Sequence, residues 1–130
     1  MPELGSVDEG AELQRVEERL VADLRAARAV ARACGNPGGG EVEVDFRNGG
    51  GWERDAAGCP GGQMVERNSA PYDEVAVEII PTGGNTLESL EFTYPTGELA
   101  EQEDVELHLA GEARVCVYAA TGSIQRGACE

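Results

Sequence analysis

The stretch LQRVEERLVADLRAARAVARAC, residues 13–34, decides the fold because it predicts a long amphipathic helix. Its apolar residues recur at steps of three and four and so form one stripe, which consists of Leu13, Val16, Leu20, Leu24, Ala27 and Ala31. Ser6 or Asp8 can cap the start of the helix, and Gly35 is a natural stop. We therefore predict a helix over residues 8–34, about 40 Å long, with one end projecting beyond the core.

The chain from Pro37 onward predicts short β-strands joined by Gly-rich turns. Apolar and polar residues alternate in the following runs: EVEVDF (41–46), EVAVEII (74–80), LESLEFTY (87–94), DVELHL (104–109) and RVCVYAA (114–120), with shorter runs QMVER (63–67) and SIQ (123–125). Residues 48–62 predict a long Gly-rich loop. One helix followed by six to seven short antiparallel strands, within residues 41–127, predicts an α+β fold in which the helix covers the sheet or sheets.

Composition limits the partners of the protein. Its 130 residues contain 25 acids and 10 bases, all of them Arg, and carry a formal net charge of −15. Such a surface repels nucleic acid and anionic membranes. No apolar run reaches the roughly 20 residues that span a bilayer. Residues 1–6, MPELGS, contain the Glu-Leu-Gly-Ser that two adjacent restriction sites encode, so we interpret them as a cloning scar and expect a single head domain over residues 7–130.

Four cysteines, Cys34, Cys59, Cys116 and Cys129, predict two disulfides and an oxidising compartment. A zinc site has little support, because there is no CxxC pair and only one His, His108. We expect no metal ion and no cofactor.

Four cysteines allow three pairings. A two-residue hairpin turn at Thr121-Gly122 would place Cys116 opposite Gly127 and near Cys129 on the same face. We therefore favour a Cys116–Cys129 bond that fixes the terminal strand, which leaves Cys34 to pair with Cys59.

Several charged residues are candidates for contacts. Arg25, Arg28 and Arg32 share one side of the predicted helix, and with Arg126 they form a possible contact set for a neighbouring subunit or for DNA. Complementing the helix dipole and pairing with nearby acids is the simpler interpretation of the helix arginines. The acids of residues 98–106 have no calcium-loop spacing and predict a solvated turn. No pairing of a nucleophile with a base is present, so we expect neither an enzyme nor a small-molecule substrate.

Three short motifs resemble the GspH/FimT family of type II secretion pseudopilins and type IV minor pilins. They are a Leu-x-x-Ala-Arg helix segment (Leu24 to Arg28), a strand and turn with Phe92, Pro95 and Gly97, and an Ala-Thr-Gly turn (Ala120 to Gly122) after the last long strand. Their order and spacing carry the resemblance, which extends over residues 11–127. It implies a pilin-like fold.

The resemblance implies a structural subunit that assembles with other pilins or pseudopilins. A missing N-terminal apolar helix would hold the precursor in the inner membrane, with the head in the periplasm or outside the cell, and a prepilin peptidase would cut and methylate the native terminus. One alternative is a DNA-uptake minor pilin that binds duplex DNA, which the net charge disfavours. Another is a free-standing secreted binding domain with disulfides.

Overall fold

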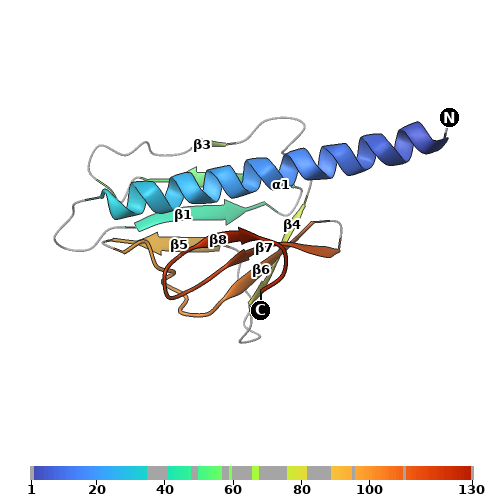
Figure 1. The fold of residues 1–130 in the computed structure, drawn as a ribbon. Coiled ribbons are helices and arrows are strands. Elements are labelled where there is room, and N and C mark those ends of the chain that lie inside the picture. The colour runs from blue at the N-terminus through green and yellow to red at the C-terminus, as the bar shows by residue number, and fades with distance from the viewer. Residues whose placement is uncertain are drawn as a thin grey trace.

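The computed structural model describes residues 2–34, 41–47, 50–56, 59, 66–67, 76–81, 89–94, 96–109 and 111–129. Among these residues, one helix packs on two antiparallel sheets (Figure 1). This arrangement is the α+β fold that the sequence predicts.

Helix α1 (Pro2–Arg32) begins six residues before the predicted start and ends two residues before the predicted end. The predicted apolar stripe is its buried face: Val16, Leu20, Leu24, Ala27 and Ala31 are all fully buried, and Leu13 is partly buried at its edge. The proposal that Ser6 or Asp8 caps the helix is wrong, because both residues lie inside α1, and Gly35 lies outside the described residues. The N-terminal part of the helix extends past the sheets, as expected (Figure 1).

Two sheets lie against this helix. In one, the strand order is β3 (Glu66–Arg67), β2 (Trp52–Asp55), β1 (Glu41–Phe46) and β5 (Ser89–Thr93). In the other, it is β4 (Val77–Pro81), β6 (Val105–Leu109), β7 (Glu112–Val117) and β8 (Ile124–Arg126). Seven of these strands have three or more residues, and β3 has two. We call the two sheets the first and the second sheet.

Strand β2 lies inside the residues for which we predicted a loop. It pairs with β1, with Trp52 opposite Phe46. The side chain of Trp52 is buried, whereas the other three residues of the strand are only partly buried. With one apolar residue, β2 has no alternation that a sequence pattern can detect.

The last hairpin also differs from the prediction. Tyr118 N donates to Ser123 O at 2.9 Å and Gly122 N donates to Tyr118 O at 2.7 Å, so the connection has four residues, 119–122, instead of two. Cys116 consequently lies opposite Gln125 and not opposite Gly127. Because this shift is two residues, each side chain keeps its predicted face of the sheet.

One core fills the space between the helix and the sheets. The buried face of α1 meets alternate residues of the first sheet, among them Val42, Val44, Leu90 and Phe92. The second sheet contributes Val105, Leu107, Leu109, Val115, Val117 and Ile124. This core fixes the second half of the helix against the last strands. The predicted contact arginines lie on these same elements.

Candidate functional site at the C-terminal half of the helix

The chain end is fixed to the outer side of the second sheet. A disulfide joins Cys116 to Cys129, and Cys129 N donates to Glu106 Oε2 at 2.9 Å. Glu106 Oε1 lies 3.2 Å from His108 Nε2, and these two hydrogen bonds lower the pKa of Glu106. The second disulfide joins Cys34 to Cys59. The pairing is the one favoured from the sequence.

Two of the predicted contact arginines bind the C-terminal turn and the first residue of β8. Arg28 Nε donates to the carbonyl oxygen of Thr121 at 2.8 Å, and Arg25 Nη2 donates to that of Ile124 at 3.1 Å. Carbonyl oxygens of a turn need donors, and a guanidinium presents several in a fixed plane. These bonds join the helix to the turn and to β8, both more than 90 residues away in sequence, rather than to the acids that we expected.

Two glycines pack against each other beside Arg28 and Arg32. A Cβ on Gly97 would come within 2.8 Å of Arg28 Cγ and 2.9 Å of Arg32 Cγ. A Cβ on Gly122 would overlap the carbonyl oxygen of Gly97. Both glycines have positive φ, +79° and +70°, which other residues adopt at a cost. The three motifs of the sequence therefore meet at one point, which we call the glycine junction (Arg28, Arg32, Gly97, Thr121 and Gly122).

Arg126 of β8 forms ion pairs with two acids of the helix. Its Nε lies 2.8 Å from Glu17 Oε2, and its Nη2 lies 3.5 Å from Glu18 Oε1. Arg114 Nη1 lies 3.6 Å from the other oxygen of Glu17. Glu17 is buried, with 9% of its surface exposed, so its charge needs these partners. The sequence analysis missed Glu17, although its place beside Val16 on the helix puts it at the edge of the apolar stripe.

Trp52 anchors β2 to the helix. Its indole Nε1 donates to Asp23 Oδ2 at 2.8 Å, and its ring is almost fully buried. A buried Trp usually has such a partner. The same carboxylate oxygen of Asp23 also binds Arg19 Nε at 3.1 Å.

Carboxylates crowd the face of the first sheet that points away from the core. Glu43 lies opposite Glu91 on one side and opposite Asp55 on the other. A hydrogen bond to Asp45, partial burial, and the negative charges of Asp45 and Glu91 raise the pKa of Glu43 to about 7. Burial is the main cause that raises the pKa of Glu91 and of Glu101. Like charges directly opposite one another destabilise a sheet.

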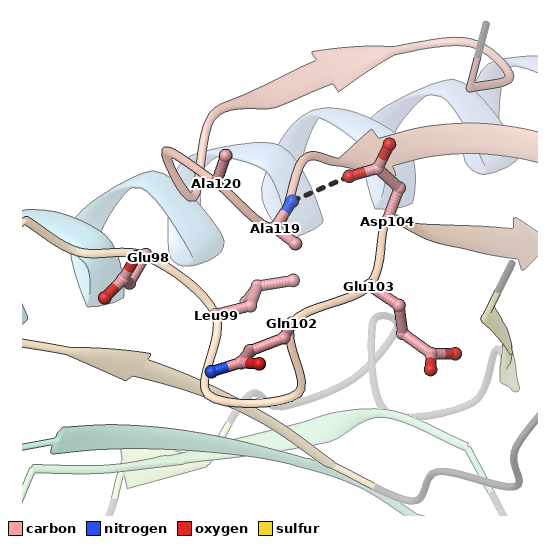
Figure 2. A pocket seen from close by; sticks show the side chains of 7 residues that line it. All are labelled: Glu98, Leu99, Gln102, Glu103, Asp104, Ala119 and Ala120. Atoms are coloured by element: carbon pink, nitrogen blue, oxygen red, sulfur yellow. Dashed lines mark hydrogen bonds between the residues drawn. The ribbon is translucent and has the colours of Figure 1, made fainter. Parts of the chain in front are cut away.

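A pocket lies beside the glycine junction, between the β5–β6 connection and the C-terminal turn (Figure 2). Its volume is about 520 Å³, and its lining residues are Glu98, Leu99, Gln102, Glu103, Asp104, Ala119 and Ala120. Ala119 N donates to Asp104 Oδ1 at 2.8 Å, and Leu99 N donates to Ala119 O at 3.0 Å. These two hydrogen bonds join the β5–β6 connection to the C-terminal turn. The sequence indicated only a solvated acidic turn here.

Among the described residues, no group of three or more His, Cys, Asp or Glu side chains is arranged to hold a metal ion. Within the same residues, α1 is not apolar enough to cross a membrane.

Comparison with known proteins shows a similar fold at low sequence identity. No family model and no curated protein matches the sequence. The crystal structure of the type IV minor pilin FimU from Pseudomonas aeruginosa is similar, with a TM-score of 0.64 and 18% identity. The match covers 92% of this chain and 91% of that chain. This likeness supports a pilin-like α+β fold for the chain.

Proposed function

We propose that this chain is the soluble head of a minor pilin or pseudopilin, a structural subunit that assembles with others into a type IV pilus or a type II secretion pseudopilus. The observation that carries the proposal is the fold similarity to FimU, which spans nearly the whole length of both chains. The three motifs that resemble the GspH/FimT family support the finer assignment, because they form one contact, the glycine junction.

The projecting part of α1 supports an anchored subunit. The helix extends beyond the sheets on the N-terminal side of Leu13, which is the first core residue among the side chains that the structure describes (Figure 1). A helix that leaves its domain in this way needs further contacts for stability, because isolated helical segments of this length are marginal in water. We propose that an apolar helix continues this axis in the native protein, holds the precursor in the inner membrane, and packs in the filament after processing.

The intramolecular bonds of the arginines argue against the DNA-uptake alternative. Arg28 donates to a turn carbonyl, Arg25 donates to a carbonyl of β8, and Arg126 pairs with Glu17. Groups that are already bound must give up these partners before they neutralise a phosphate. We therefore assign these arginines a role in holding the head together.

The experiment that tests the proposal is the mass and N-terminal sequence of the protein isolated from its own cells, both from membranes and from sheared surface filaments. We expect a methylated N-terminus followed by about 20 apolar residues, and recovery of the protein in both fractions. An unmethylated terminus close to Val7, in a protein released freely to the medium or periplasm, would overturn the proposal in favour of a secreted domain.

A further inference from the structure

The last residues of the chain return over the outer face of the second sheet, where Cys129 is bonded to Cys116 of β7. The neighbours of Cys116 in this strand, Val115 and Val117, belong to the core, whereas Cys116 does not. Cys116 is nevertheless fully buried, and Cys129 is only partly exposed. The chain end therefore packs on this face instead of extending into solvent.

Glu106 of β6 is next to both cysteines of this disulfide. It lies directly opposite Cys116 in the β6–β7 register, and its Oε2 accepts the amide hydrogen of Cys129 with an N–O distance of 2.9 Å. Residues directly opposite each other in an antiparallel pair have Cβ atoms about 4.5–5.5 Å apart. Glu106 consequently stands beside one cysteine and holds the backbone of the other.

His108 fixes the orientation of the Glu106 carboxylate. His108 Nε2 lies 3.2 Å from Oε1, which leaves Oε2 for the amide of Cys129. The side chains of His108 and Glu106 are only 22% and 24% exposed, so water competes little for these bonds. Because both residues belong to β6, the acceptor for the amide of Cys129 is in place before the chain end arrives.

The thiol of an unpaired Cys129 has an acceptor as well. Its Sγ lies 3.5 Å from the carbonyl oxygen of Val105. Before the disulfide forms, the thiol can donate weakly to this oxygen while the amide of Cys129 donates to Glu106. Both acceptors belong to consecutive residues of β6, so together they place the thiol beside Cys116.

We propose that Glu106 is a positioning residue for the closure of the Cys116–Cys129 disulfide. Its carboxylate holds the returning chain end on β6, so that the Cys129 thiol meets Cys116 instead of moving freely with the last residues of the chain. A hydrogen bond that forms more completely in the closed chain than in the open chain must favour closure by the same factor. This role is independent of the proposed function.

Closure is a thiol–disulfide exchange with a small disulfide oxidant such as oxidised glutathione. The thiolate of Cys129 attacks one sulfur of the oxidant, which forms a mixed disulfide and releases one glutathione thiolate. The thiolate of Cys116 then attacks Cys129 Sγ and releases the second glutathione thiolate. The protein loses two electrons and two protons, and the oxidant is reduced to two thiols. Glu106 assists the second step, because that step needs the two sulfurs side by side.

The test measures how strongly each pair of cysteines favours its disulfide. The full chain is equilibrated at pH 7 with mixtures of reduced and oxidised glutathione, its thiols are alkylated, and peptide mapping gives the oxidised fraction of each pair. This fraction yields the effective concentration of one thiol at the other, for Cys116–Cys129 and for Cys34–Cys59 in the same sample. We expect Glu106→Ala to lower the value for Cys116–Cys129 about tenfold and to leave Cys34–Cys59 within about twofold of the wild type.

Glu106→Gln and Glu78→Ala are the matched variants. Glutamine keeps an acceptor oxygen at position 106, and the charge hardly enters the equilibrium, because the thiols and the disulfide are all neutral at pH 7. We therefore expect Glu106→Gln to remain within about threefold of the wild type. Glu78 lies opposite His108 on the same face of the sheet. Glu78→Ala should leave both disulfides unchanged, because it removes a carboxylate from this face without removing the acceptor of Cys129.

Three results would overturn the inference. An unchanged value in Glu106→Ala would show that the hydrogen bond to Cys129 does not assist closure. An equal fall for both disulfides would show a general loss of stability instead. A fall in Glu106→Gln as large as that in Glu106→Ala would show that the charge of Glu106, and not its acceptor oxygen, affects closure.

Discussion

Replacing Gly122 by Ala tests the glycine junction directly. Gly122 has a φ of +70°, and a Cβ on it would overlap the carbonyl oxygen of Gly97 and lie 3.3 Å from Arg28 Cδ. Gly111 is a matched control, because its φ of +81° is similar and no atom lies within 4 Å of a Cβ placed there. The two substitutions share the conformational cost and differ in the steric contact.

The expected losses of unfolding free energy follow from these two terms. An alanine in the left-handed region costs about 1–2 kcal/mol, which is the whole effect expected for Gly111→Ala. Gly122→Ala adds overpacking of about 1–3 kcal/mol, because the atom in its way belongs to the backbone and cannot rotate aside. With roughly 4 °C per kcal/mol for a domain of this size, Gly122→Ala should lower the Tm by about 8–20 °C and Gly111→Ala by about 4–8 °C.

Thermal unfolding followed by circular dichroism, with both disulfides intact, measures the difference. Urea unfolding of the same variants checks the free energies and, through an unchanged slope, the two-state assumption. Equal losses for the two variants would refute the reasoning, because the contact between Gly97 and Gly122 would then contribute nothing.

Three further predictions concern other parts of the head. Replacing Cys116 and Cys129 together by Ser should cost about 3 kcal/mol in urea unfolding, because the bond closes a loop between residues 13 apart; an unchanged midpoint would contradict this. Glu43→Gln should stabilise the protein by about 1 kcal/mol at pH 8 and should not change its stability at pH 4. The gain at pH 8 is smaller than the pKa shift alone implies, because the side chain remains in contact with water. The sign follows because a folded pKa of about 7, above the unfolded value near 4.5, makes stability fall as pH rises between the two, so an equal gain at both pH values would contradict it. Trp52→Phe should cost about 1–2 kcal/mol by leaving the Asp23 carboxylate one donor short, and thermal unfolding with no loss would show that this hydrogen bond contributes nothing.

Much of the fold was predictable from the spacing of apolar residues. The helix stripe matches the buried face of α1, and EVEVDF matches β1 at both ends, because each pattern repeats often enough to define its period. Element ends were less predictable. The helix extends back to Pro2, and β2 escaped detection because only Trp52 marks it.

The contacts of the site were less predictable than its residues. Sequence spacing placed Arg25 and Arg28 on one side of a helix, but not against a turn and a strand more than 90 residues away. It placed Glu17 at the edge of the apolar stripe, but it could not show that two arginines of the second sheet would lie against that acid. Contacts of this kind between distant residues depend on how the sheets pack against the helix. Local sequence patterns do not encode that packing.

The glycine junction shows why three short motifs can indicate a fold when each is weak by itself. A side chain on Gly122 would clash only because Gly97 lies against it, and Arg28 reaches the carbonyl of Thr121 only because that turn lies over the helix. Each motif thus has a physical reason only in the presence of the other two, so finding all three in order is far less expected by chance than finding any one. The junction itself is covered by Arg28 and Arg32, and it holds the helix, the β5–β6 connection and the C-terminal turn together.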